Sequence, residues 1–169
     1  MTVQRKPLTY SQYLKLEAAE PNTQHEFLRG EVWARERGTP EHALFAANFI
    51  GLVGALRGRP CAPYGSDLRV RVEATDRTTY PDCIVVCGPR EVSADDQNAI
   101  VNPTVILEVT CDGTEADDRG AKFAHYRRLE SLREYVLVSP SEPSVEVFRR
   151  EGDHWSFYET RAGGVLHLA

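Results

Sequence analysis

The sequence predicts a single mixed α/β domain, in which a sheet with buried central strands is covered by two helices and bordered by hairpins. Two runs rich in β-branched residues, Asp82–Cys87 and Thr104–Val109, lack polar alternation, as strands buried on both faces do. Segments with the apolar spacing of helices lie before and after these runs. The length of 169 residues and the apolar content of 41% fit one domain over residues 1–169.

The N-terminal half is expected to form two helices and four strands. A capping-box pattern begins the first helix at Thr9, and Thr39 is the expected N-cap of the second. The second helix is apolar along most of its length, so we expect it to lie mostly in the core. The last of the four strands alternates apolar and polar residues, which predicts a solvated basic face with Arg69 and Arg71. The predicted ranges are helices over Thr9–Glu17 and Pro40–Arg57, and strands over His25–Leu28, Glu31–Arg35, Cys61–Pro63 and Asp67–Val72.

The C-terminal half is expected to contain one helix and a β-meander. Between the two central strands, Arg90–Val101 is predicted to be a polar connection. After the second of them, a turn at Asp112-Gly113 and a capping box that begins at Thr114 predict a helix to about Leu129. The chain then ends in strands separated by proline and glycine residues. Their predicted ranges are Glu134–Ser139, Ser144–Arg149, His154–Thr160 and Val165–Leu168.

Composition and charge exclude several classes of protein. No apolar stretch is long enough to span a membrane and the N-terminus lacks a signal-peptide core, so we expect a cytoplasmic protein with no membrane partner. Twenty basic and 25 acidic side chains give a net charge of -5, so any basic surface for a nucleic acid must be local. Most of the basic residues are arginines. Lys122 either remains by chance or is a lysine because a compact point charge is needed there.

The four cysteines do not have the close paired spacing of a zinc site. They are Cys61, Cys83, Cys87 and Cys111, and each falls in an apolar, strand-like run. The sequence therefore predicts buried thiols in a reducing compartment.

Asp82 and Glu108 are carboxylates that the apolar pattern of their strands does not explain. A charge inside a buried strand is costly unless it is paired or binds a cation. Two carboxylates at adjacent strand ends offer the hard oxygen ligands that Mg²⁺ or Mn²⁺ prefers. The alternative is structural, with Asp82 capping its strand and Glu108 paired with a buried arginine.

Lys122 adds a cation to this pair. Asp118, Lys122 and Tyr126 follow a helical spacing of four residues and so share nearly one helix face. A right-handed connection would bring this helix over the sheet and point the Lys122 ammonium toward Glu108. There it would hold a water or stabilise the charge that develops on a phosphate. The alternative is a surface ion pair between Asp118 and Lys122.

Short segments along nearly the whole chain resemble one family. They are Thr9-Tyr10, His25–Glu31, Tyr80–Val86, Asn102–Val109, Asp118–Lys122 with Tyr126, and Glu134–Val138. In order and spacing they resemble the Uma family of restriction-endonuclease-like proteins, within the PD-(D/E)XK nuclease superfamily. The resemblance implies a restriction-endonuclease-like core, in which helices flank a mixed central sheet with N-terminal and C-terminal hairpins.

The resemblance also implies a metal-dependent DNA endonuclease, a hydrolase that acts on phosphodiester bonds with Mg²⁺ or Mn²⁺. Asp82 and Glu108 would hold the metal, with Glu26 as a further acidic member of the site. Lys122 would take the role of the catalytic lysine. In the superfamily pattern that lysine comes two residues after the glutamate, where this chain has Thr110, so here the lysine would have moved to the helix.

Further residues are candidates to line the same cleft, namely His42, Asp118 and Tyr126, and more weakly His125. The basic strand face would supply local phosphate contacts. The resemblance implies a homodimer, and a single small domain that cuts both DNA strands would need two copies.

Two alternatives to the DNA endonuclease stay open. The chain could be a catalytically silent nuclease-fold protein that acts as a dimeric binding or regulatory module. It could also hydrolyse another phosphoester. The presence of Asp82, Glu108 and Lys122 together favours the enzyme over the module.

Overall fold

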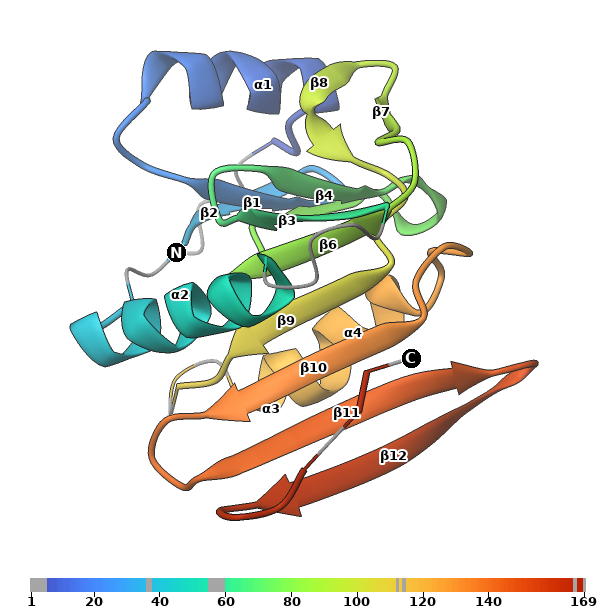
Figure 1. Cartoon of the computed structure of the whole chain (residues 1–169). Helices are drawn as coiled ribbons and strands as arrows, with labels where there is room; N and C mark the ends of the chain where they lie inside the picture. Colours follow the sequence, from blue (N-terminus) through green and yellow to red (C-terminus); the bar gives the residue numbers. More distant parts are fainter. Residues whose placement is uncertain are drawn as a thin grey trace.

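The structure, a computed structural model, describes residues 6–35, 38–54, 60–111, 113, 115–165 and 167–168. Within these ranges the chain is a mixed α/β fold (Figure 1). The helical elements are α1 (Tyr10–Ala19), α2 (Pro40–Gly54), the 3₁₀-helix η1 (Glu73–Thr75), α3 (Glu115–Asp117), the π-helix η2 (Asp118–Lys122) and α4 (Phe123–Tyr126). The strands are β1 (His25–Leu28), β2 (Glu31–Ala34), β3 (Cys61–Gly65), β4 (Arg69–Val72), β5 (Arg77–Thr79), β6 (Cys83–Cys87), β7 (Val92–Ser93), β8 (Asp96–Ile100), β9 (Val105–Val109), β10 (Glu134–Ser139), β11 (Ser144–Glu151) and β12 (His154–Arg161).

The strands form two six-stranded mixed sheets. The β9 sheet has the order β12-β11-β10-β9-β6-β3, and the β1 sheet has the order β2-β1-β5-β4-β8-β7. In the centre of the β9 sheet, β9 pairs in parallel with β10 and antiparallel with β6. The β1–β2 hairpin and the β11–β12 hairpin lie at sheet edges (Figure 1). The predicted fold class, a mixed sheet flanked by helices with hairpins at both ends of the chain, is confirmed.

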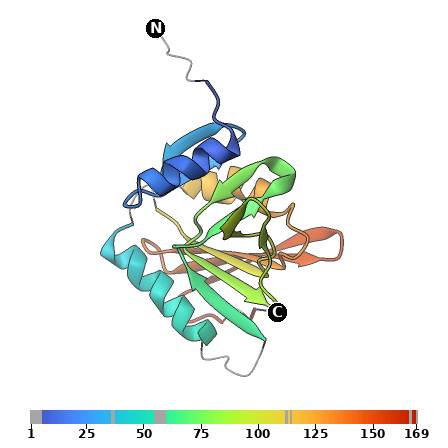
Figure 2. The same cartoon turned by 90° about the horizontal axis from the view of Figure 1, so that it is seen from above.

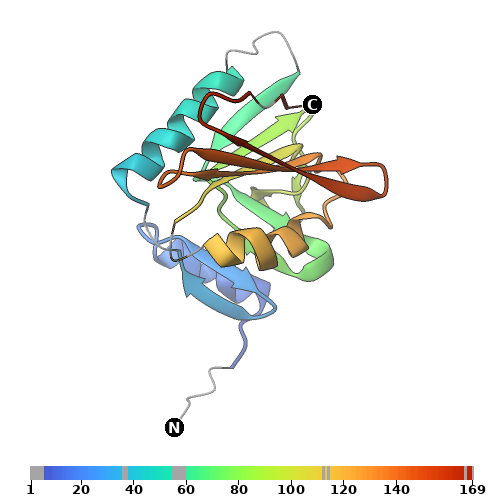
Figure 3. The same ribbon diagram turned by 90° about the horizontal axis from the view of Figure 1, so that it is seen from below.

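The central strands of the β9 sheet bury side chains on both faces, as their unbroken apolar runs predict. Figure 3 shows α2 on one side of this sheet and the α3–α4 segment on the other. The cluster on the α4 side includes Ile84, Ile106, Tyr126 and Leu137. The cluster on the α2 side includes Val53, Val85, Leu107 and Val136. The sheet is therefore a middle layer, and a residue at its strand ends can be reached from the helices on both sides.

The N-terminal helix and hairpin form as predicted. Thr9 and Gln12 make the capping box of α1, and the helix continues to Ala19, two residues past its predicted end. The hairpin turns at Arg29 and Gly30, with positive φ angles of 49° and 93°. A Cβ atom on Gly30 would lie 2.6 Å from the side chain of Pro7, so both the turn and the close approach of the chain favour glycine there. The hairpin turn fixes the pairing register of β1 and β2, and with it the position of Glu26 on β1.

The prediction that the second helix is mostly core is wrong. Val53 is the buried residue of α2, whereas Leu44 and Leu52 are 59% and 72% exposed. The helix packs over β3, β6 and β9 on one face of the β9 sheet and contacts the sheet with one side only (Figure 2). Its N-terminus is capped as predicted, because the backbone N–H of His42 donates to Thr39 Oγ1 over 3.2 Å. The predicted end of this helix at Arg57 lies outside the described residues.

No helix within the described residues is long and apolar enough to cross a membrane.

The prediction of a solvated basic face on β4 is also wrong. Arg69 and Arg71 are each only 9% exposed. Arg69 donates to both carboxylate oxygens of Asp96, and the Arg71 guanidinium lies 3.9 Å from the ring centroid of Tyr10. Helix α1 and strand β8 cover this face, so neither arginine is placed for the phosphate contact predicted above.

Arg90–Val101 is not a plain connection. It contains the β7–β8 hairpin, and β8 pairs in parallel with β4 in the β1 sheet. Asp96 of this segment serves the second sheet by binding Arg69, and Asn102, which follows the segment, accepts from the backbone N–H of Glu91 over 2.9 Å. Strand β5 was not predicted either.

The single helix predicted after β9 forms as one continuous helical run over residues 115–126, but its middle is a π-helix. Three residues of α3 lead into the π-helix η2, and α4 ends at Tyr126 rather than Leu129. Thr114, its predicted cap, and Asp112 of the predicted turn lie outside the described residues. Asp118 and Lys122 nevertheless remain neighbours, with 2.8 Å between Oδ1 and Nζ.

The last predicted strand, Val165–Leu168, does not form at residues 165, 167 and 168, and residue 166 lies outside the described residues. The chain turns after β12, where the backbone N–H of Gly164 donates to the carbonyl of Arg161 over 2.9 Å. The other three strands of the meander form as β10, β11 and β12, each pair antiparallel.

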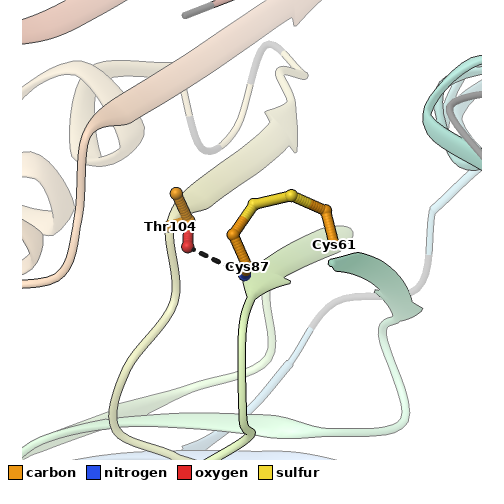
Figure 4. Close-up of a disulfide and its surroundings, with 3 residues drawn as sticks. All are labelled: Cys61, Cys87 and Thr104. Carbon is orange, nitrogen blue, oxygen red and sulfur yellow. Dashed lines mark hydrogen bonds between the residues drawn. A yellow bond between two sulfur atoms is a disulfide. The ribbon is translucent and has the colours of Figure 1, made fainter. Parts of the chain in front are cut away.

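The cysteine prediction is wrong for three residues. Cys61 and Cys87 are joined by a disulfide at the β3–β6 edge of the β9 sheet (Figure 4), and Cys111 is exposed. The antiparallel register places Cys61 directly opposite Cys87, with 3.9 Å between their Cα atoms. Only the pairing of two strands that are distant in sequence brings these thiols together. Cys83 is buried as predicted, and burial raises the pKa of its thiol to about 12.

Candidate functional site

A cavity of about 210 Å³ opens where the β1–β2 hairpin, the start of α2, the ends of β6 and β9, and η2 come together. The residues that line it are Glu26, Trp33, Ala34, Arg35, Gly38, His42, Asp82, Glu108, Val109, Cys111, Asp117, Asp118 and Lys122. The set includes Glu26, Asp82, Glu108 and Lys122, together with two of the three predicted cleft residues, His42 and Asp118. Both sheets and helices on both sides of the β9 sheet therefore contribute to one cavity.

Asp82 lies just before β6, beside the end of β9. Its Oδ2 accepts the backbone N–H of Val109 over 2.8 Å and lies 3.0 Å from His42 Nε2, while Arg35 donates to its Oδ1. Burial alone would raise the pKa of this carboxyl. The hydrogen bond from His42 and the charge of Arg35 outweigh that effect and lower it, so Asp82 is an anion at neutral pH.

Glu108 projects from the middle of the site and is only 2% exposed. Its Oε1 accepts from Tyr126 Oη over 2.9 Å and lies 3.3 Å from Lys122 Nζ. Burial raises the pKa of Glu108 to about 8, with Lys122 opposing the rise and the neighbouring carboxylates of Asp82 and Asp118 adding to it. Burial therefore makes the ionised form of Glu108 less favourable in the metal-free protein.

Lys122 is the buried cation of the site. Its Nζ lies 2.8 Å from Asp118 Oδ1, 3.3 Å from Glu108 Oε1 and 3.9 Å from Glu26 Oε1. Burial would lower the pKa of this amine, but Glu108, Glu26 and Asp118 outweigh burial and raise it. The side chain therefore remains an ammonium ion. The pair with Asp118 exists, but it is buried and not the surface ion pair considered as an alternative.

Glu26, on β1, faces the same cavity and is 3% exposed. Its Oε2 lies 3.2 Å from the guanidinium of Arg77, which is also within 3.3 Å of Asp117. Trp33 is the cross-strand partner of Glu26 in the β1–β2 register. Glu26 is therefore held between the cations Arg77 and Lys122.

Two further candidates lie behind the cavity lining. Tyr126 is fully buried and bridges Glu108 and the hydroxyl of Thr79, which lies 2.8 Å from Tyr126 Oη. His125 lies away from the cavity, where burial and the charge of Arg77 lower the pKa of its imidazole. Tyr126 is thus placed to hold Glu108, and His125 has no part in the lining.

Sequence reasoning did not identify Arg35, Arg77 or Trp33. One signal was available for Trp33, because a two-residue turn at Arg29-Gly30 fixes the hairpin register, and counting back from the turn pairs residue 26 with residue 33. The positions of Arg35 and Arg77 depend on how the β1 sheet stands against the β9 sheet. The hydrophobic pattern carries no signal for that arrangement.

The donor chemistry of the cavity fits a hard divalent cation. In the part of the chain that the structure describes, no three His, Cys, Asp or Glu side chains are placed so that they could hold one metal ion together. The cationic groups of Arg35 and Lys122 lie against the carboxylates of Asp82 and Glu108. Burial nevertheless disfavours the charged form of Glu108, and a divalent cation bound by carboxylate oxygens would stabilise that form.

Comparison with known proteins agrees with this fold. Residues 10–168 match the Uma2 family model, described as "Putative restriction endonuclease". The uncharacterized protein slr1290 of Synechocystis sp. (strain ATCC 27184 / PCC 6803 / Kazusa) is 29% identical over 163 residues, which cover 95% of this chain and 84% of the relative. The uncharacterized protein sll1609 of the same organism is 28% identical over 149 residues, which cover 88% of this chain and 84% of the relative.

A solved structure shares the fold. The crystal structure of "a putative nuclease belonging to DUF820" from Anabaena variabilis ATCC 29413 superposes with a TM-score of 0.72 and covers 96% of this chain and 89% of that one. The two sequences are 19% identical. At this identity the likeness shows the fold alone.

Proposed function

This chain belongs to the Uma2 family, whose model is described as "Putative restriction endonuclease", and from that premise we propose that it is a metal-dependent endonuclease that hydrolyses phosphodiester bonds in DNA. The observation that carries the proposal is the meeting of Asp82, Glu108 and Lys122 in one cavity. Two acids and a lysine from separate segments would have no reason to share a buried space if each served only its own strand or helix.

Asp82 and Glu108, with Glu26, would hold Mg²⁺ or Mn²⁺ in this proposal. The ion supplies Lewis acidity to a phosphate oxygen and to a water molecule when it is bound. Asp82 is prepared for this role because it is already ionised. A bound cation would favour the ionised form of Glu108, and Tyr126, which donates to Glu108 Oε1, would keep the carboxyl group oriented.

Lys122 would stabilise negative charge on the reacting phosphate. Its three carboxylate neighbours keep it an ammonium ion, so it cannot act as a general base. A fixed ammonium at the wall of the cavity would instead orient the attacking water and offset the charge that develops on the phosphate oxygens. Asp118, 2.8 Å from Nζ, would hold the lysine in that position.

A catalytically silent binding module is the second candidate, and one observation favours it. Arg35 and His42 contact both carboxylate oxygens of Asp82, so that this acid is already neutralised within the chain. A silent module would not bind Mg²⁺ or Mn²⁺ in isothermal titration calorimetry. The endonuclease would bind it, and the Asp82→Asn variant would not.

Cleavage assays test the proposal directly. Purified protein would be incubated with supercoiled and linear DNA in Mg²⁺, in Mn²⁺ and in EDTA. We expect cleavage that needs the metal, and a loss of at least about 100-fold in Asp82→Asn and in Lys122→Ala, since removing one group that stabilises developing charge costs about that much. Lys15→Ala, which changes an exposed lysine on α1, is the matched control and should cleave normally.

Two results would overturn the assignment. One is cleavage that survives both site substitutions, and the other is a wild-type protein inactive on both forms of DNA with both metals. The homodimer remains a prediction within this proposal, because cutting both strands with one small domain needs two copies. Light scattering of the purified protein measures its mass in solution.

A further inference from the structure

Trp33 is a large aromatic side chain at the rim of the candidate site. It pairs with Glu26 across the β1–β2 hairpin, and cross-strand partners project from the same face of a sheet (Figure 1). Both residues line the cavity that holds Asp82, Glu108 and Lys122. The indole therefore lies next to the site and belongs to the same wall as one of its acids.

The buried guanidinium of Arg77 lies over the indole ring of Trp33. The guanidinium carbon of Arg77 lies 5.4 Å from the ring centroid of Trp33. Arg77 is only 3% exposed, and its contacts with Glu26 and Asp117 fix its position. A cation over one face of an indole holds the ring by cation–π attraction. The ring is therefore a preorganised surface rather than a mobile side chain.

The ring is also accessible to a ligand. Trp33 is 38% exposed. In addition to the site cavity, Trp33 and Ala34 line a second hollow of about 1020 Å³, whose other lining residues include Lys6 and Pro7. The indole thus borders two hollows. If a ligand ring stacked on the indole, the groups attached to that ring would have space in these hollows.

We propose that Trp33 is a stacking platform for an unpaired nucleobase, so that the substrate is single-stranded DNA or DNA with an unpaired nucleotide beside the scissile phosphate. This inference rests on the proposed nuclease function. Bases inside a duplex stack on their own neighbours and offer no open ring face, whereas an unpaired base stacks readily on an exposed aromatic side chain. The platform selects for strand state and not for base sequence, because every base has an aromatic face.

Binding measurements on three variants test the platform. The dissociation constant of a labelled oligothymidylate would be measured by fluorescence anisotropy, in EDTA to prevent cleavage and again in Mg²⁺. We expect Trp33→Ala to weaken binding by about 5- to 150-fold, the effect of losing one stacked base. Trp33→Phe should retain part of the affinity. Tyr158→Ala on β12 is the matched control, since Tyr158 is 37% exposed, and it should bind like the wild type.

Tryptophan fluorescence reports the contact itself. The chain has two tryptophans, and Trp155 packs against Phe123 in the apolar core with 5.2 Å between ring centroids. Oligothymidylate should quench the wild type, and the quenching should disappear in Trp33→Phe. The same strand with abasic sites keeps the phosphates and lacks the bases, so it should not quench.

The outcomes separate this inference from the proposed function. Quenching without cleavage under any condition would support the platform and overturn the nuclease. Metal-dependent cleavage by a Trp33→Ala variant that binds oligothymidylate as tightly as the wild type would overturn the platform and leave the nuclease intact. Equal quenching by the abasic strand or by a duplex would overturn the platform, and so would an absence of binding to every nucleic acid tested. Circular dichroism confirms that each variant is folded.

Discussion

Two buried clusters of charged residues can be compared within this chain. The site cluster, Glu26, Asp82, Glu108, Asp118 and Lys122, lines the cavity. The Arg69 cluster, Arg69, Asp96, Glu17 and Tyr80, lies between α1 and the β1 sheet and does not line that cavity. Both bury charge in a protein of 169 residues, and burial of charge is costly wherever it occurs.

The Arg69 cluster satisfies its charges internally. Arg69 donates to both oxygens of Asp96 over 2.6 and 2.8 Å and to Tyr80 Oη over 2.6 Å, and Tyr80 donates to Glu17. Burial would raise the pKa of Asp96, but the hydrogen bonds from Arg69 outweigh it and lower it. Asp96 is therefore an anion that gains from being folded.

The site cluster leaves one acid unfavourably placed. Glu108 has a cation 3.3 Å away, yet its pKa is raised to about 8, because burial and the nearby carboxylates outweigh Lys122. The sign of the shift separates the two clusters more clearly than burial does. A buried acid with a lowered pKa stabilises the fold, and a buried acid with a raised pKa beside a cavity marks a place where an external cation would be accommodated.

The largest expected effect is on the Arg69 cluster. Arg69→Met leaves Asp96 buried without its partner, and we expect the free energy of unfolding to fall by about 3–5 kcal/mol. Urea denaturation followed by circular dichroism measures the loss. Arg161→Met is the control, because Arg161 forms an exposed ion pair with Glu159 and should change stability by less than about 1 kcal/mol. Equal effects of the two substitutions would contradict the structural role of the cluster.

Metal should stabilise one cluster only. Mg²⁺ at 100 times its dissociation constant should add about 2.7 kcal/mol to the stability of the wild type through mass action. Asp82→Asn should lose this response. Asp96→Asn, the matched change in the Arg69 cluster, should lower the baseline stability and keep the response. Thermal unfolding with and without Mg²⁺ measures both, and a response retained by Asp82→Asn would place the ion elsewhere.

The two acids should give opposite pH dependences of stability. The folded-state pKa of Glu108 is raised from 4.5 to about 8, so its contribution is present at low pH and is lost as the pH rises through about 8. Glu108→Gln should therefore unfold a few degrees above the metal-free wild type at pH 9. The pKa of Asp96 is lowered, so its contribution is present above 3.8 and is lost as the pH falls below that value. Melting curves of the wild type, Glu108→Gln and Asp96→Asn from pH 3 to pH 9 measure both dependences. The same change in melting temperature with pH in the two variants, relative to the wild type, would contradict the comparison.

The smallest expected effect concerns Tyr126, which supports Glu108. Tyr126→Phe removes the hydroxyl that contacts Glu108 and Thr79 and should cost about 1 kcal/mol of stability. DNA cleavage should fall as well, because Glu108 loses its orienting contact. Tyr158→Phe removes an exposed hydroxyl bonded to Glu151 and should alter stability by less than about 0.5 kcal/mol. Unchanged cleavage in Tyr126→Phe would mean that Glu108 is held without it.

The sequence identified Asp82 and Glu108 because they interrupt apolar patterns, whereas Glu26 was expected only from the family resemblance. Asp82 and Glu108 are conspicuous in runs that otherwise suit buried strands, and the spacing of Asp118, Lys122 and Tyr126 keeps these three on one side even through a π-helix. The meeting of Asp82, Glu108, Asp118 and Lys122 in one cavity agrees with the expected pairing of the two strands and the crossover to the helix, and Tyr126 lies behind the cavity lining. Their chemical roles remain predictions.

The sequence did not reveal the Arg69 cluster because alternation reports only that two faces of a strand differ. It does not report whether a second layer covers the polar face. In β4 that layer is α1 and β8, and the partner Asp96 comes 27 residues after Arg69. Helix α2 poses the opposite difficulty. Its sequence is apolar on nearly all sides, so the pattern does not indicate which face is buried, and only Val53 of its residues is buried.

The covalent loop closed by the Cys61–Cys87 disulfide includes residues of both clusters. It closes a covalent loop across a sequence separation of 26, and this loop contains both Arg69 and Asp82. In a chain-entropy description, such a crosslink restricts the unfolded ensemble by about 3–4 kcal/mol. Reduction of the Cys61–Cys87 disulfide would therefore change the free energy of unfolding of the wild type, against which every substitution described above is compared.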